Sequence, residues 1–137
     1  ETLEAGEAAR ILGTGVILGA PNVVRGGSHN GNVSAVDLIA MGHCDALASD
    51  YHYPSLRRAA FFVEQAGLCN LASAWALVSS GPARLLGLED RGTLAIGQRA
   101  DVVIVEAESR RLTATIAGGR ISYMSGDIAK RFIQSGN

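Results

Sequence analysis

The first half of the chain alternates short apolar runs with amphipathic stretches. The runs within 16–18 and 45–49 are short and continuous, which is typical of strands buried on both faces of a parallel sheet. Apolar residues at helical spacing predict helices over 2–12, 36–41, 54–66 and 71–79. Strands that alternate with helices in this way predict an α/β fold built on a parallel sheet.

Local signals mark where several of these helices begin and end. Ser34 and Asp37 have the three-residue spacing of a capping box, and Asn70 is a typical N-cap for the helix that follows it. Pro54 suits the first turn of its helix, since proline lacks only an amide that the first turn does not use. Gly81 and Pro82 are expected to end the helix over 71–79.

The pattern changes near Gly87. Glycines then separate short β-rich runs at 102–105, 112–116 and 121–124. Gly118 and Gly119 between the last two runs predict a two-residue hairpin turn, because a type I′ turn needs positive φ at both central positions. We therefore expect an α/β part over 1–86 and a β-rich part over 87–137.

Composition excludes several classes of protein. The 137 residues carry 12 basic and 13 acidic side chains, so the net charge of −1 gives no field that would attract nucleic acid or an anionic membrane. No apolar run reaches the roughly 20 residues that span a bilayer, and no secretory signal is evident. Cys44 and Cys69 lie among apolar neighbours without metal-ligand spacing, which favours reduced thiols in a cytoplasmic protein.

A polar segment at 19–35, GAPNVVRGGSHNGNVSA, follows the first expected strand. We interpret it as the loop that leaves this strand at the carboxyl edge of the sheet, where ligands bind in such folds. Its glycines let backbone amides approach an anion, and side chains add hydrogen-bonding groups. Those side chains are Arg25, Ser28, His29, Asn30 and Asn32. The alternative is that the segment only makes turns and that Arg25 is solvated.

Asp50 follows the second expected strand, before Tyr51, His52 and Tyr53. A carboxylate held at the end of a buried strand can ligate a metal and accept a proton from metal-bound water. The alternative is that Asp50 caps the helix that begins near Pro54. His52 has a weaker claim as a loop residue, and His43 is expected to interact with carbonyl groups at a helix end.

These motifs resemble a known family. The segment at 19–35 and LASDYHYPSLRRAAF at 47–61 are similar to the phosphonate-metabolism branch of the amidohydrolase superfamily, the ribose 1-methylphosphonate 5-triphosphate diphosphatases of the carbon–phosphorus lyase pathway. GPARLLGLEDRGTLAIGQRADVVIVE at 81–106 resembles the ending found throughout that superfamily. The resemblance covers nearly the whole chain but only the final part of a family member.

The resemblance implies a particular architecture. Residues 1–86 would be the last βα units of a metal-dependent (β/α)8 barrel, and 87–137 would supply strands of a small composite β-sandwich. A complete barrel takes about 250 residues, so it would be incomplete in this chain. The start of the chain inside an expected helix is consistent with a cut.

The resemblance also implies a reaction and a site. A divalent metal centre of one or two ions, expected to be zinc, would hydrolyse the triphosphate of a phosphorylated sugar phosphonate and release diphosphate, with most metal ligands outside this chain. Asp50 matches the aspartate after the eighth barrel strand and would be both metal ligand and catalytic base. Seven residues of the first loop would face the substrate: Asn22, Arg25, Gly26, Gly27, Ser28, His29 and Asn32.

Two other functions are compatible with parts of the sequence. One is another amidohydrolase, of the dihydroorotase or adenine deaminase type, since the ending at 81–106 is widely shared. The other is a phosphate-binding module without enzymatic activity. Under the family interpretation the fragment is inactive alone, and its open strand edges favour a homo-oligomer or a domain-swapped dimer.

Overall fold

The structure is a computed structural model that describes residues 3–25 and 34–134. The chain forms two compact units, Glu1–Glu89 and Asp90–Asn137, and each is described by itself. No helix in the described part of the chain is both long and apolar enough to cross a membrane.

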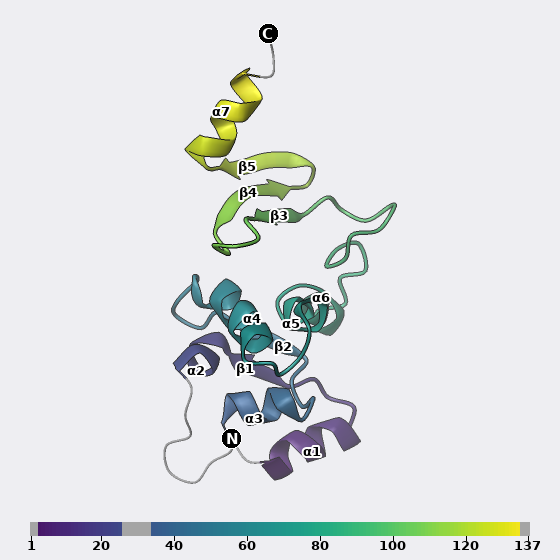
Figure 1. The fold of residues 1–137 in the computed structure, drawn as a ribbon. Helices are drawn as coiled ribbons and strands as arrows, with labels where there is room; N and C mark the ends of the chain where they lie inside the picture. The colour runs from purple at the N-terminus through teal and green to yellow at the C-terminus, as the bar shows by residue number, and fades with distance from the viewer. Residues whose placement is uncertain (1–2, 26–33, 135–137) are drawn as a thin grey trace. The chain divides into compact units, whose positions relative to one another are not determined.

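Unit 1 is an α/β unit, as the sequence predicts. Strands β1 (Ile17–Gly19) and β2 (Ala46–Ala48) pair in parallel, with Leu18 opposite Leu47. Helices surround this pair (Figure 1): α1 (Leu3–Ile11), α2 (Ala20–Arg25), α3 (Ala35–Ala40), α4 (Ser55–Gln65), α5 (Leu71–Ala76) and α6 (Ser80–Leu85). The parallel pairing predicted from the two short apolar runs is therefore confirmed.

The core of unit 1 lies between the strand pair and helices α2, α3 and α4. Its largest fully buried side chains are Leu18, Val23, Leu38 and Val63. Val23 comes from α2 and Val63 from α4, and these two helices pack against each other. Burying side chains of this size contributes about 1.5–3 kcal/mol each, and this packing holds the end of α2 beside the start of α4.

The capping signals are confirmed. The Ser34 hydroxyl accepts the Asp37 amide at 3.1 Å, and the Asp37 carboxylate accepts the Ser34 amide at the same distance, which completes the capping box. The Asn70 side chain accepts the Ser73 amide at 2.9 Å. Cys44 and Cys69 form no disulfide and pack against the core, as expected, and burial raises the pKa of the Cys69 thiol.

One sequence expectation for unit 1 is wrong and another is only partly confirmed. Residues 20–25 form helix α2 and not a loop, because Ala20, Pro21 and Val23 are buried and a proline near a helix start removes no needed hydrogen bond. The helix expected over 71–79 ends before Gly81, as expected, but it ends at Ala76, and Gly81 and Pro82 lie in the first turn of a further helix, α6, where proline is tolerated.

Unit 2 contains a three-stranded antiparallel sheet in the order β3 (Val102–Val105), β4 (Leu112–Ala117) and β5 (Arg120–Met124). Gly118 and Gly119 connect β4 to β5 with φ of 56° and 78°, which confirms the hairpin turn. Helix α7 (Gly126–Gln134) follows β5 and departs from the purely β-rich expectation (Figure 1). The spacing of Ile128 and Phe132, one helical turn apart, is the signal for it.

Candidate functional site

The carboxyl ends of β1 and β2 meet at one edge of the strand pair. Gly19 at the end of β1 is opposite Ala48 at the end of β2. Helix α2 leaves the first strand there, and the turn at Ser49, Asp50 and Tyr51 leaves the second. This is the edge at which α/β folds bind ligands, and the structure places the Asp50 segment on it.

Asp50 adopts a left-handed backbone conformation, with φ of 56°. This conformation is unfavourable for residues other than glycine, although aspartate and asparagine tolerate it best. Its side chain is exposed, and no described residue gives the carboxylate a hydrogen bond or an ion pair. A strained, outward-facing carboxylate without a described structural partner is typical of a functional position.

The helix-cap alternative for Asp50 is wrong. The N-cap of α4 is Pro54, which makes no side-chain capping bond. The turn is held instead by Ser55, the first residue of α4, whose hydroxyl donates to the carbonyls of His52 and Ser49. Ser55 is only 3% exposed, so the hydrogen bonds that stabilise the Asp50 turn come from a buried residue.

Arg25 at the end of α2 contacts Tyr51 on the Asp50 turn. Arg25 Nη2 donates a hydrogen bond to Tyr51 Oη, and its Cζ lies 5.9 Å from the centre of the Tyr51 ring. The guanidinium therefore has both a hydroxyl and an aromatic ring of Tyr51 as neighbours. The contact links the ends of the two chain segments that follow β1 and β2.

A pocket of roughly 200 Å³ lies beside this contact. The described residues that line it come from α2, the Asp50 turn and the first turn of α4: Pro21, Val24, Arg25, Tyr51, His52, Ser55 and Arg58. Two of them are arginines and none is acidic. The pocket therefore favours an anionic ligand.

The residues proposed from the sequence are distributed unevenly around this site. Arg25 lines the pocket, whereas Asn22 is exposed on α2 and Asp50 lies next to lining residue Tyr51. The other candidates lie outside the described residues: Gly26, Gly27, Ser28, His29, Asn30 and Asn32. Sequence reasoning assigned no site role to Tyr51, Ser55 or Arg58. The last two could have been found from their separation of three residues, which places them on one helix face.

The two histidines with weaker claims differ in their surroundings. His52 belongs to the turn, as expected, and its amide donates to the Ser49 carbonyl at 3.1 Å. The backbone amide of His43 donates to the carbonyl of Leu38 in the last turn of α3 at 2.8 Å, so His43 interacts with a helix-end carbonyl as expected. Its side-chain Nδ1 is buried and has no hydrogen-bond partner among the described residues.

The described residues do not form a metal site by themselves. No group of three or more His, Cys, Asp or Glu side chains within residues 3–25 and 34–134 could hold a metal ion. Asp50 could supply one ligand, because its carboxylate follows the carboxyl end of β2, is exposed and has no partner among those residues. It fits the role of one oxygen ligand in a centre whose other ligands come from elsewhere.

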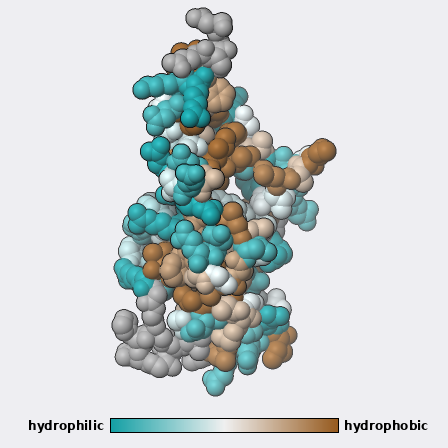
Figure 2. Space-filling model, viewed as in Figure 1, coloured by the Kyte–Doolittle hydropathy of each residue, from teal (hydrophilic) through white to brown (hydrophobic). Residues whose placement is uncertain are grey.

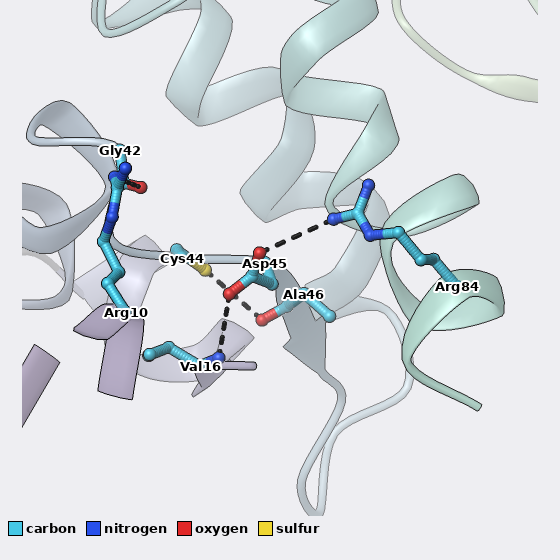
Figure 3. Close-up of polar contacts among 7 residues, drawn as sticks. All are labelled: Arg10, Val16, Gly42, Cys44, Asp45, Ala46 and Arg84. Carbon is cyan, nitrogen blue, oxygen red and sulfur yellow. Dashed lines mark hydrogen bonds and ion pairs between the residues drawn. The ribbon is translucent and has the colours of Figure 1, made fainter. Parts of the chain in front are cut away.

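The opposite edge of the strand pair is structural. Asp45, just before β2, accepts the Val16 amide at 2.9 Å through Oδ2, and Oδ1 lies 3.5 Å from Arg84 Nη2 on α6 (Figure 3). On the same side, Arg10 of α1 donates to the Gly42 carbonyl at 3.1 Å. Polar groups at the amino ends of the strands are thus used to join elements of the fold.

Comparison with known proteins decides the family. Residues 38–123, more than half of the chain, match the sequence model of the Amidohydrolase family. The chain belongs to the Amidohydrolase family. The superfamily identified from the sequence motifs is therefore confirmed.

Two curated amidohydrolase relatives match parts of the chain. An α-D-ribose 1-methylphosphonate 5-triphosphate diphosphatase from Escherichia coli (strain K12) is 46% identical over 113 residues, which is 81% of this chain and 30% of the relative. An N-acyl-D-glutamate deacylase from Alcaligenes xylosoxydans xylosoxydans is 41% identical over 71 residues, 47% of this chain and 14% of the relative. The chain thus spans less than a third of either relative.

Solved structures support the fold. A β-aspartyl dipeptidase from Fervidobacterium islandicum AW-1 in complex with a β-Asp-Leu dipeptide has a TM-score of 0.72 at 19% identity, over 93% of this chain and 38% of that one. A second structure of this dipeptidase has a TM-score of 0.71 at 22% identity, over 90% of this chain and 36% of that one. At these identities the likeness concerns the fold alone.

Proposed function

We propose that this chain is the C-terminal part of a metal-dependent hydrolase of phosphonate metabolism. The reaction is hydrolysis of α-D-ribose 1-methylphosphonate 5-triphosphate to the 5-phosphate and diphosphate. The observation that carries this proposal is the 46% identity, over 81% of the chain, to a protein of that name. The anion-favouring pocket beside Asp50 supports it, because the substrate carries a triphosphate.

In this proposal β1 and β2 are the last strands of a (β/α)8 barrel, and unit 2 supplies strands to a composite β-sandwich. A pair of parallel strands is unusual by itself, because parallel sheets are normally larger and covered on both faces. Apolar side chains are exposed in both units, for example Ile17 at 56% and Ile121 at 60%, and Figure 2 shows brown apolar surface on both. Missing barrel and sandwich elements would cover such surface.

Asp50 is proposed as metal ligand and proton acceptor at the reaction centre. A divalent ion, proposed to be zinc, would activate water and offset negative charge on the reacting phosphate. The exposed Asp50 carboxylate, at the strand edge, can accept the proton that this water loses. The hydrogen bonds from Ser55 to the Ser49 and His52 carbonyls hold the backbone on both sides of Asp50.

The substrate phosphates are proposed to bind the segment after β1. Arg25 supplies a guanidinium at the pocket. Asn22, Gly26, Gly27, Ser28, His29 and Asn32 remain proposed contributors of side-chain and backbone hydrogen bonds. Charge-assisted bonds of this kind are the strong ones in phosphate recognition.

We further propose a cytoplasmic protein that does not bind nucleic acid or membranes. The near-neutral net charge of −1 supports the absence of both partners. The isolated chain is proposed to be inactive and to form a homo-oligomer or domain-swapped dimer through its open strand edges. A monomeric elution profile at micromolar concentration would contradict the assembly.

The match to an N-acyl-D-glutamate deacylase gives a second candidate, the hydrolysis of an amide by the same family. The two candidates differ in the substrate that the full-length polypeptide would consume. We would purify that polypeptide with zinc and measure diphosphate release from the ribose triphosphate and amine release from N-acyl-D-glutamate. Diphosphate release supports the first proposal, whereas amine release alone overturns it.

A further inference from the structure

Arg58 is a pocket residue to which the sequence comparison assigns no role. It is the fourth residue of α4, whereas Arg25 is the last residue of α2. Two arginines from two different helices thus line one small pocket, and the packing of α2 on α4 holds those helices together.

Neither arginine is neutralised within the described part of the chain. Arg25 bonds a phenol, and no described carboxylate pairs with Arg58. Several other arginines lie next to carboxylates: Arg84 and Asp45, Arg91 and Asp90, Arg99 and Asp101, Arg111 and Asp127. The pocket therefore carries two positive charges that no described carboxylate offsets.

The remaining groups of the pocket favour the same sign of ligand. Tyr51 Oη accepts from Arg25, so its own O–H proton is free to point to another acceptor. The first turn of α4 contains no acidic residue and has no side-chain cap, which leaves the partial positive charge of this helix end uncompensated. Pro21 and Val24 form an apolar wall that strengthens electrostatic interactions.

We propose that Arg25 and Arg58 form a two-arginine clamp for one phosphoryl group, with the Tyr51 hydroxyl as a third donor. Arginine suits this role because its planar group binds phosphate oxygens through two parallel bonds. The inference rests on the proposed function for the identity of the phosphorylated substrate. The charges and donors of the pocket, however, carry its preference for phosphate independently of that reaction.

The pocket is large enough to hold a phosphoryl group. Its volume of roughly 200 Å³ corresponds to about six or seven water molecules at ~30 Å³ each. Arg58 is therefore a specificity-determining residue for one phosphate of the substrate. It touches neither the bond that breaks nor the proton that Asp50 accepts in the proposed reaction.

The test is calorimetric titration of this chain with inorganic phosphate and with diphosphate at low ionic strength. We expect Arg58→Gln to weaken binding of both anions about ten- to a hundredfold, as for loss of a charge-assisted bond. Arg57→Gln is the matched control, since it removes the same charge from the adjacent residue of α4 but lies outside the pocket lining. Arg58→Lys should recover only part of the affinity, because lysine lacks the two-pronged geometry.

Two results would overturn the clamp: no phosphate binding by the wild-type chain, or equal losses for Arg58→Gln and Arg57→Gln. Circular dichroism melting of each variant tells a lost contact from a lost fold, and Arg25→Gln gives a second, independent variant of the clamp. The full-length polypeptide separates this inference from the proposed reaction. Phosphate binding that depends on Arg58, without diphosphate release, overturns the reaction alone, whereas diphosphate release with a KM unchanged by Arg58→Gln overturns the clamp alone.

Discussion

Asp45 and Asp50 flank the same three-residue strand, β2, and have opposite surroundings. Asp45 accepts the Val16 amide and faces Arg84, whereas Asp50 has no described partner and a left-handed backbone. The carboxylate at the amino end of β2, that of Asp45, thus stabilises the fold, whereas that of Asp50 after the carboxyl end is available for binding or catalysis.

Removing the Asp45 carboxylate is expected to destabilise unit 1. Asp45→Ala leaves the part-buried Val16 amide without its acceptor and should lower the free energy of unfolding by about 1–3 kcal/mol. Arg84→Gln is the control, since it removes only an ion pair whose arginine side chain is 68% exposed and should cost less than about 1 kcal/mol. Urea denaturation of both variants measures the difference. Equal losses would assign the stabilisation to the ion pair instead.

A second prediction concerns the close approach of α6 to β2. A Cβ atom on Gly81 would lie 2.0 Å from the Asp45 carbonyl oxygen and 2.9 Å from that of Ala76. Both obstacles are backbone atoms that cannot rotate away, so Gly81→Ala should cost about 3 kcal/mol or more.

Gly126→Ala is the control for this substitution. Gly126 begins α7 and has nothing within 4 Å of the added carbon, so alanine there should be neutral or slightly stabilising. Thermal unfolding followed by circular dichroism compares the two variants with the wild type. A Gly81→Ala protein as stable as the wild type would show that α6 does not pack this closely on β2.

The sequence predicts the regular elements well where local chemistry decides them. The Ser34–Asp37 capping box, the Asn70 cap and the Gly118–Gly119 turn all depend on residues close together in the chain, and all three form. The error at 20–25 has a tertiary cause, because Pro21 and polar neighbours suggest a loop until Val23 is seen to pack in the core. The position of Gly81 inside α6 also depends on a tertiary contact, because the carbonyl that leaves no room for a side chain there belongs to the distant residue Asp45.

The candidate site is only partly predictable for the same reason. Asp50 and Arg25 could be selected from strand ends and residue type, but the meeting of Arg25 with Tyr51 joins residues 26 positions apart. Arg58 is an ordinary exposed helix residue in the sequence. Arg58 lines the pocket because α2 packs against α4, and a contact between two separate helices cannot be predicted from a local sequence pattern.

Ser55 is expected to act as a positioning residue for the Asp50 turn. Ser55→Ala removes hydrogen bonds to the carbonyls of Ser49 and His52, which should lower the free energy of unfolding by about 1–2 kcal/mol. In the full-length enzyme it should also reduce kcat more than it changes KM, since Asp50 would be less well held. Ser73→Ala, at an exposed position of α5, should change neither. A loss of stability with unchanged kcat would leave Ser55 a purely structural role.

The last prediction separates the charge of Asp50 from its backbone conformation. Asparagine tolerates the left-handed region about as well as aspartate, so Asp50→Asn should leave the free energy of unfolding nearly unchanged. Alanine tolerates it less well, so Asp50→Ala should cost about 1 kcal/mol. In the full-length polypeptide both variants should lose about 10²–10⁴ in kcat, because both lack the carboxylate that is proposed to accept the proton. Urea denaturation of the chain and diphosphate release at saturating zinc measure the two effects separately. Turnover of Asp50→Asn close to the wild-type rate would exclude Asp50 from proton transfer, and it would do so even if Asp50→Ala were slow, because only the alanine also disturbs the turn.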